Sequence, residues 1–319
     1  MIPVSRRLDF SEIPVVDISA LVEGRSAIDA TIAALDRACR DVGFLYIRNH
    51  GVAQATIDRL VAETKLFFAL PEPEKLAIAL DQRMRGYIPL NYRSWEGEAR
   101  AGTSHQEGLW VGHERPLNDA VWFDAPNRWP ASLPGLKPAM MDYFAEVERV
   151  GVALMRGFGA ALGLGREHFV KLFEHSTSRL KPNHYPPQHN PENVNDIGVV
   201  PHSDSGGFTV LWQDDNGGLE VQSKSGEWVG APPIPGTFVV NIGNVMQIWT
   251  NGRYSSTPHR VINRNGRDRY SIPLFFNPGA AAPVTPLVGA AAPDPNPLLY
   301  GTYQKDEWRR IFPIARIPA

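Results

Sequence analysis

The sequence predicts a mainly β protein with flanking helices, in which a jelly roll follows a helical N-terminal half. After about Arg179, short runs of β-branched and aromatic residues recur between clusters of Gly, Pro, Asn and Asp, as in all-β domains. Before that point, apolar residues recur at helical spacing over longer segments. A chain of 319 residues with 43% hydrophobic content can bury a full core, but it leaves little room for several independent domains.

The N-terminal half is predicted to contain three amphipathic helices and two short strands. Helical spacing places the helices at residues 26–40, 54–70 and 137–162. Compact β-rich runs place the strands at residues 13–18 and 43–47. The turn-like Asn49-His50-Gly51 follows the second strand, and the longest helix has an amphipathic pattern suited to packing across a sheet.

The second half divides into about eight segments of four to eight residues. Turn-forming residues bound each segment, and about eight such strands are typical of a jelly roll. The predicted strands are 179–185, 198–202, 208–213, 219–222, 238–241, 245–249, 259–263 and 270–277.

The C-terminal part is predicted to hold one loop and one short helix. Residues 278–297 are rich in Ala and Pro, which argues against a long helix or a central strand, and a helix is expected near 305–311. We therefore divide the chain into a helical and mixed α/β region that supports the barrel, a jelly-roll core, and a C-terminal loop and helix, with bounds 1–178, 179–280 and 281–319. These parts are expected to form one integrated unit.

Composition and charge argue against nucleic-acid and membrane partners. The formal net charge is −2, from 32 basic and 34 acidic residues interspersed along the chain. The N-terminus carries no apolar secretory stretch, and the longest uncharged window contains Pro, Asn and Gln residues that no lipid-facing helix carries together. The single cysteine, Cys39, is expected to be a buried hydrophobe. These features fit a cytoplasmic monomer or small homo-oligomer.

Three residues of the β-rich half have the types and spacing of a metal site. In His202-Ser203-Asp204 the first and third side chains lie on one side of an extended backbone, and His259 supplies a third ligand. Two imidazoles and one carboxylate can occupy one face of an octahedral iron(II), leaving positions open for a bidentate oxo-acid and for O2. A His-x-Asp pair alone is weak evidence, because such pairs occur by chance in surface loops.

Three further residues form a candidate carboxylate site. Strand alternation points Arg269 and Ser271 the same way, and an arginine fork beside a hydroxyl suits a carboxylate. The hydroxyl of Tyr185, at the end of an earlier strand, can meet the same carboxylate. Arg267 is expected to share the strand face of Arg269 but lies outside the Arg-x-Ser motif. His184 alternates away from Tyr185 and is not expected to bind the metal.

Short motifs extend along nearly the whole chain. In the first half they are Ile13-Pro14-Val15-Val16-Asp17, Gly43-Phe44, Asn49-His50-Gly51, Phe67-Phe68, Arg85-Gly86-Tyr87 and Trp129-Pro130. In the second half they are His202-Ser203-Asp204, Gly217-Gly218-Leu219-Glu220-Val221, Asn241-Ile242-Gly243, Thr250-Asn251-Gly252, Ser256-Thr257-Pro258-His259-Arg260-Val261 and Arg269-Tyr270-Ser271. In these motifs the chain strongly resembles the isopenicillin N synthase-like branch of the 2-oxoglutarate and iron(II)-dependent dioxygenases.

The resemblance implies a double-stranded β-helix and assigns roles to the candidate residues. Iron(II) would be bound by His202, Asp204 and His259. The tail of 2-oxoglutarate would be held by Arg269, Ser271 and Tyr185. The implied reaction consumes 2-oxoglutarate and O2, releases succinate and CO2, and oxidises a C–H bond of a small organic molecule.

The resemblance also indicates where a substrate would bind. In relatives the pocket is lined by N-terminal loops and the barrel mouth. These regions nominate Arg85, Tyr87, Asn91, Tyr92, Glu107 and Phe276. One departure from the family is Asn244, where an acidic residue commonly follows the glycine.

Three alternatives remain open from the sequence. Some members of the family, including isopenicillin N synthase itself, oxidise their substrates without 2-oxoglutarate. A zinc hydrolase can also use two His and one Asp, although it has no need of the carboxylate clamp formed by Arg269 and Ser271. A jelly-roll binding protein without catalysis is the third alternative, and the intact metal triad argues against it. The sequence does not choose among hydroxylation, desaturation, ring closure and fragmentation.

Overall fold

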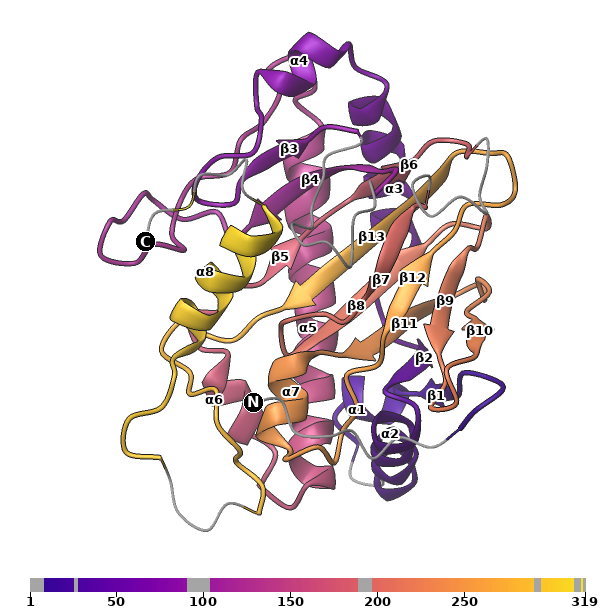
Figure 1. Ribbon diagram of the computed structural model, residues 1–319, viewed down its shortest axis with the longest axis vertical. Helices are drawn as coiled ribbons and strands as arrows, with labels where there is room; N and C mark the ends of the chain where they lie inside the picture. Colours follow the sequence, from indigo (N-terminus) through magenta and orange to yellow (C-terminus); the bar gives the residue numbers. More distant parts are fainter. Residues whose placement is uncertain are drawn as a thin grey trace.

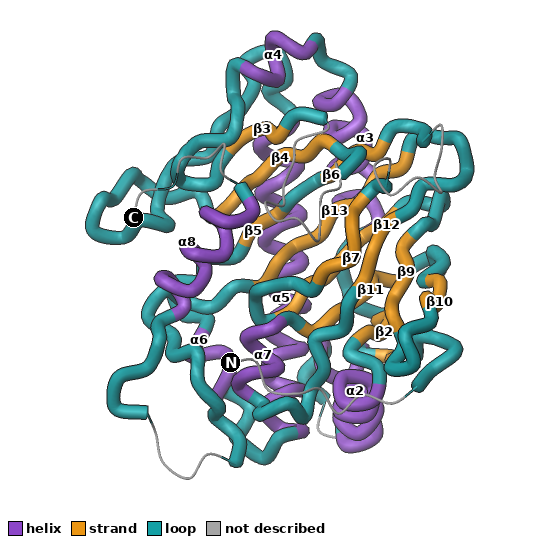
Figure 2. Tube along the Cα trace, viewed as in Figure 1, coloured by secondary structure: helices purple, strands orange, loops and turns teal. Residues whose placement is uncertain are grey.

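Two β-sheets face each other, and helices cover the outer face of the larger one (Figure 1). This computed structural model describes residues 9–25, 28–90, 104–188, 197–289, 294–312 and 317. The long helix α5, Leu136–Ala161, runs behind the larger sheet, and α8, Tyr300–Ile311, lies on the opposite side of that sheet (Figure 2). The two-sheet arrangement is the one predicted from the strand rhythm.

The larger sheet joins strands from both halves of the chain. In the described residues its order is β1 (Val15–Asp17), β2 (Phe44–Arg48), β11 (Thr237–Ile242), β8 (Phe208–Gln213), β13 (Arg269–Phe276), β5 (Arg179–Leu180), β4 (Glu107–Gly112) and β3 (Gly86–Ile88), and β6 (Asn183–Tyr185) pairs with β13 and β4. Along its strands, alternate side chains point to opposite faces of the sheet and pack into two different hydrophobic cores. In β11, Phe238 and Val240 face the helices, whereas Val239 packs toward the smaller sheet.

The smaller sheet contains the strands that carry both candidate histidines. Its order is β10 (Trp228–Gly230), β9 (Leu219–Gln222), β12 (His259–Val261) and β7 (Val199–His202). A second core fills the space between the sheets, with Phe44 and Tyr46 on one side and Val221 and Val261 on the other. The larger sheet is thereby held at a fixed distance from β7 and β12.

The described first half contains six helices, and α5 lies on the larger sheet with most of the others packed against it. They are α1 (Ser19–Val22), α2 (Asp29–Asp41), α3 (Gln54–Phe68), α4 (Glu72–Leu76), α5 and α6 (His168–Leu172). Gly151 of α5 contacts β13 so closely that a Cβ built on it would lie 1.9 Å from a ring atom of Phe276. Glycine at this position allows the helix to lie directly on the sheet, and Phe276 belongs to the core between them.

Most predicted elements are present, with shifted ends. Strands β8 and β9 begin and end where the sequence predicted, and α3 and α5 differ from prediction by one or two residues. The predicted strand 179–185 is interrupted at Lys181 and Pro182 and forms β5 and β6. Strands β3, β4 and β10 were not predicted, and α8 begins five residues earlier than expected.

The prediction of a strand at 245–249 is wrong. These residues lie in α7, Asn244–Trp249, and Val245 to Trp249 are all buried. A run of only four apolar residues and one glutamine is too short to show a helical or a strand period, so the pattern could not distinguish the two. The backbone N–H groups of Asn244 and Val245 donate to the carbonyls of Asp204 and Gly206, so the start of α7 fixes the loop after β7.

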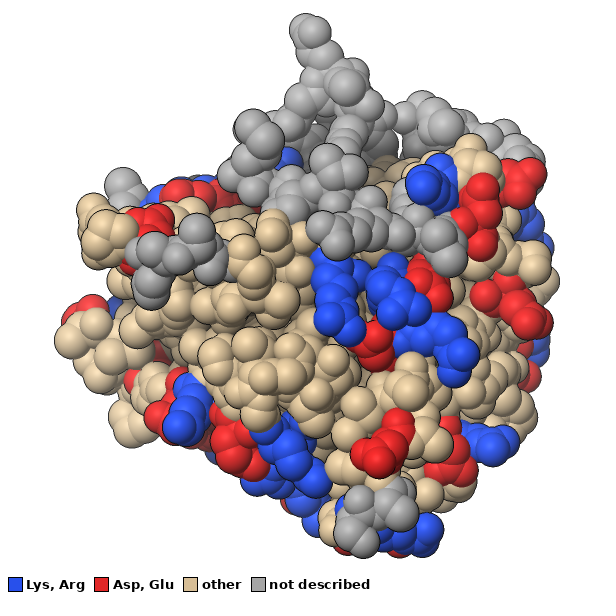
Figure 3. Space-filling view, turned by 90° about the horizontal axis from the view of Figure 1, so that it is seen from below, with Lys and Arg blue, Asp and Glu red and all other residues tan. Residues whose placement is uncertain are grey.

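The distribution of surface charge and the burial of the single cysteine are as expected from the sequence. On the face seen in Figure 3, Lys and Arg side chains have acidic side chains among them, and they form no field of one sign. Cys39 is fully buried in α2, and burial raises the pKa of its thiol well above the ordinary value. Among the described helices, none combines the length and apolar character needed to cross a bilayer.

Candidate active site

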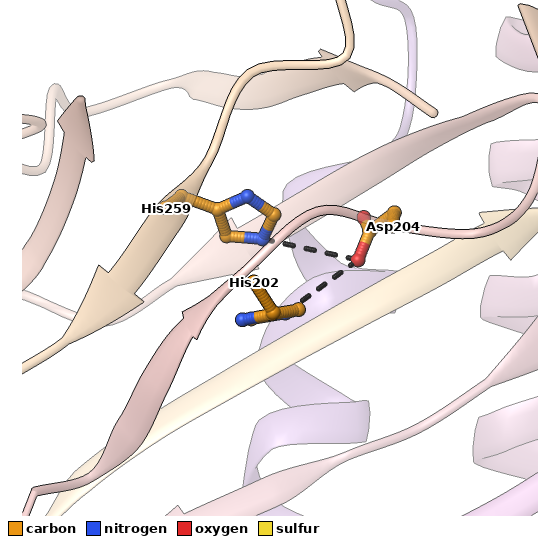
Figure 4. A group of neighbouring side chains, drawn as sticks. All are labelled: His202, Asp204 and His259. Atoms are coloured by element: carbon orange, nitrogen blue, oxygen red, sulfur yellow. Dashed lines mark ion pairs between the residues drawn. The ribbon is translucent and has the colours of Figure 1, made fainter. Parts of the chain in front are cut away.

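Three ligand-type side chains meet where the smaller sheet faces the larger one (Figure 4). Antiparallel pairing of β7 and β12 sets His202 opposite His259, and their ring centroids lie 4.3 Å apart. The Oδ1 atom of Asp204 is 3.7 Å from His202 Nε2 and 3.8 Å from His259 Nε2. One ligand atom from each residue lies within 4.8 Å of the others. In the described part of the chain, no other three His, Cys, Asp or Glu side chains gather in this way.

Hydrogen bonds turn the ligand atoms toward one another. His202 Nδ1 lies 2.9 Å from the carbonyl of Val200, and His259 Nδ1 lies 3.2 Å from that of Thr257. An N–H donated to a carbonyl places the proton on Nδ1 and leaves the Nε2 lone pair available to a metal.

The carboxylate of Asp204 is held in the same manner. Thr209 Oγ1 and Asn241 Nδ2 donate to its Oδ2 atom over 2.5 and 2.7 Å. Because both donors occupy Oδ2, Oδ1 faces the two histidines. Thr209 and Asn241 lie on β8 and β11, so the larger sheet orients a ligand that follows the smaller one.

The protonation states of the site suit metal binding. Burial raises the pKa of Asp204, but the facing imidazoles and the hydrogen bonds from Thr209 and Asn241 lower it by a larger amount. The net pKa is therefore below its ordinary value. Burial, together with the charge of His259, lowers the pKa of His202 to about 4. At neutral pH the carboxylate is ionised and the His202 imidazole is neutral, as metal ligands must be.

The donor set fits iron(II). Two imidazole nitrogens and one carboxylate oxygen from three positions of the chain form the facial triad that leaves coordination positions open. A structural zinc site takes four protein ligands, and the described residues supply no fourth His, Cys, Asp or Glu to this group.

A cavity of about 90 Å³ opens beside the triad, between the two sheets. It is lined by all six residues predicted to bind metal or oxo-acid: His202, Asp204, His259, Arg269, Ser271 and Tyr185. Pairing of β13 with β6 sets Arg269 opposite Tyr185, which explains how two distant segments reach one cavity. The structure thus brings the two predicted motifs together.

Arg269 ends in this cavity with one donor unused. Its side chain is almost fully buried, Nε donates to the carbonyl of Gly217, and Nη2 lies 3.4 Å from Gln213 Oε1. Its Nη1 atom is buried and has no acceptor among the described residues. The guanidinium lies 4.7 Å from the ring centroid of Tyr185, whose hydroxyl is 3.4 Å from Ser271 Oγ. Donors without an acceptor in a buried cavity indicate a site for an anion.

A larger cavity of about 340 Å³ adjoins His202 and Asp204. Four large aromatic side chains form one part of its wall. The ring of Trp110 stacks on Phe275 with centroids 5.5 Å apart, and it meets Trp308 of α8 and Phe312 edge-on at 6.0 and 5.8 Å. The residues that line both cavities are Gln106, Lys181, Val199, His202, Asp204 and Phe275.

Two of the residues nominated for substrate binding form one buried network. Glu107 lines the larger cavity, but both of its oxygens are already bound. Lys75 Nζ and the Tyr87 hydroxyl donate to Oε2, and His184 Nδ1 lies 2.7 Å from Oε1. His184 also meets Asp268 at 2.8 Å and lies outside the metal triad, as predicted. Tyr87 lines neither cavity and is linked to the larger one through Glu107.

Two other nominated residues, Arg85 and Phe276, do not line the cavities. Arg85 is fully buried and donates to the carbonyl of Phe123, away from both spaces. Phe276 faces α5, because the alternation that turns Arg269, Ser271 and Phe275 inward turns Phe276 outward. The nomination of Phe276 therefore misses the cavity wall by one residue. Asn91 and Tyr92 lie outside the described residues.

Several cavity residues were not identified from the sequence. Lys181 has the strand phase of Tyr185, so the alternation that selected Tyr185 also contained the signal for Lys181. No local pattern marks Trp308 on α8, which reaches the site from the far end of the chain. Asn244 lines the larger cavity as well, so the position that departs from the family belongs to the site.

Comparison with known proteins identifies the family. The model of the 2OG-Fe(II) oxygenase superfamily matches residues 176–278, and that of the N-terminal region of non-haem dioxygenases in morphine synthesis matches residues 13–132. A probable iron/ascorbate oxidoreductase of Dictyostelium discoideum is 35% identical over 288 residues, which cover 80% of this chain and 77% of that protein. The chain belongs to the 2OG-Fe(II) oxygenase superfamily.

Solved structures of other members confirm the jelly-roll fold of this oxygenase. A full-length Neurospora crassa protein in complex with alpha-KG and thymine has a TM-score of 0.82 and 26% identity, and the match covers 95% of this chain and 97% of that one. JOX2 in complex with 2OG, Fe and JA has a TM-score of 0.79 and 29% identity, with coverages of 94% and 86%.

Family membership decides between the alternatives at the level of reaction class. The protein is an oxidoreductase that uses iron(II), 2-oxoglutarate and O2, and it acts on a small molecule. The alternatives of a zinc hydrolase and of a binding protein without catalysis are therefore set aside.

Proposed function

We propose that this oxygenase binds iron(II) through His202, Asp204 and His259, and anchors the distal carboxylate of 2-oxoglutarate on Arg269. Ser271 and Tyr185 would complete the carboxylate site. In the overall reaction, a substrate C–H bond, O2 and 2-oxoglutarate yield a C–OH group, succinate and CO2. One oxygen atom enters the substrate and the other enters succinate, so the oxo-acid supplies the two electrons that O2 still requires.

One observation carries the proposal. The three metal-type ligands and the unsatisfied Nη1 of Arg269 line the same buried cavity of about 90 Å³. A diacid that spans this cavity can present one end to a metal on the triad and the other to the guanidinium. A hydrolytic metal site has no use for a buried cation at this place.

Hydrogen bonds within the chain orient the three proposed metal ligands before the metal binds. The carbonyls of Val200 and Thr257 keep both imidazoles in the tautomer that offers Nε2, and Thr209 with Asn241 keeps Asp204 Oδ1 directed inward. Bound iron(II) would supply the activation of O2 needed to oxidise a C–H bond. The aromatic side chains on one part of the larger cavity would exclude water from that side of the substrate.

The test separates metal, oxo-acid and turnover. The full chain is titrated with 2-oxoglutarate under nitrogen, with and without Fe(II), by calorimetry. O2 is then admitted and succinate is measured by mass spectrometry. We expect 2-oxoglutarate binding that depends on the metal, and succinate after O2 is added. Oxidation that is indifferent to 2-oxoglutarate would favour the oxidase-like branch of the family and contradict the proposal.

The division of the chain into parts, its cellular compartment and its oligomeric state also remain proposals. We infer that residues 1–178 form a helical and mixed α/β support for the barrel, 179–280 its jelly-roll catalytic core and 281–319 a C-terminal loop and helix, within one integrated unit. The single, buried Cys39 fits a reducing cytoplasm. We infer a monomer or small homo-oligomer, which light scattering coupled to size-exclusion chromatography would test.

A further inference from the structure

Lys181 is a cation at the boundary of the two cavities, and no carboxylate of the described residues pairs with it. It lines both cavities together with His202 and Asp204. None of the ion pairs or hydrogen bonds among the described residues involves its Nζ atom, which lies 5.7 Å from the ring centroid of Trp110. Burial lowers the pKa of Lys181 to about 8, which still leaves most of the ammonium protonated at neutral pH.

The other charged side chains on the described wall of the larger cavity have counterparts or a place in the metal site. Glu107 is paired with Lys75 at 2.7 Å and bound to His184, and Glu307 is paired with Arg310 at 2.7 Å. Asp204 belongs to the proposed metal centre, where its charge faces the metal. Lys181 therefore contributes a positive charge that forms no ion pair with a described side chain, although the carboxylate of Asp204 on the same wall raises its pKa.

The fold holds Lys181 in place rather than leaving it on a mobile chain. Its backbone N–H donates to the carbonyl of Pro273, and the carbonyl of the next residue, Pro182, accepts from Leu109. A Cβ built on Gly108 would lie 2.9 Å from Lys181 Cε, so the glycine in β4 leaves the space that the lysine stem occupies. Both neighbouring strands thus direct the ammonium group to the cavity.

Other unsatisfied polar groups lie on the same wall. Trp110 Nε1 is buried without an acceptor, and Gln106 Oε1 is buried without a donor, among the residues described. Both residues line the larger cavity. Two donors, an ammonium and an indole N–H, are therefore available beside an aromatic surface formed with Phe275 and Trp308. A neutral, wholly apolar ligand would leave all of these groups unsatisfied at a cost.

We propose that the substrate of this oxygenase is a small organic acid, whose carboxylate is bound by Lys181 with the Trp110 indole N–H as a second donor. Its apolar or aromatic body lies against Phe275, Trp308 and Phe312. This inference rests on the proposed function, because it identifies the substrate class of the same site. A carboxylate of 2-oxoglutarate is the competing source of the anion, and the experiment distinguishes the two.

The experiment measures binding before turnover. The full chain with Mn(II) and 2-oxoglutarate is titrated with matched acids and primary amides, phenylacetate against phenylacetamide and indole-3-acetate against indole-3-acetamide, by calorimetry and tryptophan fluorescence. The variants are Lys181→Met, which removes the charge, Lys181→Arg, which keeps it, and Trp110→Phe, which removes the indole N–H and keeps a smaller aromatic ring in the wall. The exposed Lys224 provides the control Lys224→Met.

We expect at least one acid to bind about ten-fold or more tightly than its amide, since a charge-assisted hydrogen bond in a shielded site has this effect. Lys181→Met should remove that preference, Lys181→Arg should retain part of it, and Trp110→Phe should weaken the acid more than the amide. Affinity for 2-oxoglutarate should change less than about three-fold in all of them. Lys224→Met should behave as wild type.

Two outcomes would overturn the inference. The first is that no acid of the panel binds wild type more tightly than its amide. The second is that Lys181→Met weakens 2-oxoglutarate binding about ten-fold, which would assign the lysine to the cosubstrate. Failure of the proposed function is recognised separately, because wild type would then show no metal-dependent 2-oxoglutarate binding at all.

Discussion

Replacing Arg269 by alanine tests the oxo-acid site directly. The guanidinium is almost fully buried, and its Nη1 atom has no acceptor in the described part of the protein, so a bound carboxylate can accept a hydrogen bond from this donor. A charge-assisted hydrogen bond in such a place is worth about 1.5–3 kcal/mol. Arg269→Ala should therefore weaken 2-oxoglutarate binding by roughly ten-fold to a hundred-fold.

The variant should also lose some stability. Removing the side chain takes the donor from the carbonyl of Gly217, and a buried acceptor left unpaired costs about 1–3 kcal/mol. Arg269→Lys keeps a charge but not the planar fork, so we expect its 2-oxoglutarate affinity to lie between those of wild type and the alanine variant.

The assay is anaerobic calorimetry of 2-oxoglutarate binding to the Mn(II)-loaded protein, with metal binding and unfolding measured in parallel. Arg267→Ala is the control. The structure corrects the expectation that Arg267 shares the strand face: it precedes β13, its side chain is 60% exposed, and its Nη1 lies 3.8 Å from Asp215. We expect Arg267→Ala to bind 2-oxoglutarate as wild type does. Equal titrations for wild type and Arg269→Ala, with both proteins folded, would refute the carboxylate clamp.

Three further predictions concern the metal, a buried ion network and a helix contact. His259→Ala should bind iron weakly and lose turnover, with an unchanged circular dichroism spectrum. Asp204→Glu should lose most activity, because the extra methylene displaces the carboxylate oxygen that faces the metal. Wild-type turnover in either variant would contradict metal ligation. Burial lowers the pKa of His184, but Glu107 and Asp268 raise it more, so the net pKa is above its ordinary value. The charged His184 therefore stabilises the fold fully below about pH 6.5, and this stabilisation disappears as the pH rises through the higher folded-state pKa. In urea titrations, His184→Asn should lower the unfolding free energy more at about pH 5.5 than at about pH 9. Equal losses of unfolding free energy at the two pH values would show that charge is not involved. Gly151→Ala should cost about 1–3 kcal/mol of unfolding free energy through overlap with Phe276, and an unchanged urea midpoint would contradict the close contact.

Local strand geometry was enough to nominate four of the six residues that we propose bind metal and oxo-acid. The spacing of His202 and Asp204, and the alternation of Arg269 and Ser271, follow from the period of an extended chain. Strands β8 and β9 were located accurately since turn-forming residues bound them on both sides. What the sequence alone lacked was the pairing that brings His259 beside His202, which the family resemblance supplied.

The lining of the larger cavity was predicted poorly for a physical reason. Its wall comes from β4, from the break between β5 and β6, and from α8, which are far apart in the chain and carry no shared periodic signal. Phe276 was chosen in place of Phe275, although the phase set by Arg269 and Ser271 already pointed Phe275 inward. Long-range packing, and not local propensity, determines which side chains meet there.

The position of α8 separates the part of the chain that lines the larger cavity from the part that lines the smaller one. The helix contributes Gln304, Glu307, Trp308, Arg310 and Ile311 to the larger cavity, and no residue of it lines the smaller one in the described chain. Exchange of a short C-terminal stretch between paralogues can therefore give an existing oxidation machinery a new specificity without rebuilding its cofactor site. A laboratory recombination library joined just before Tyr300 would use the same freedom.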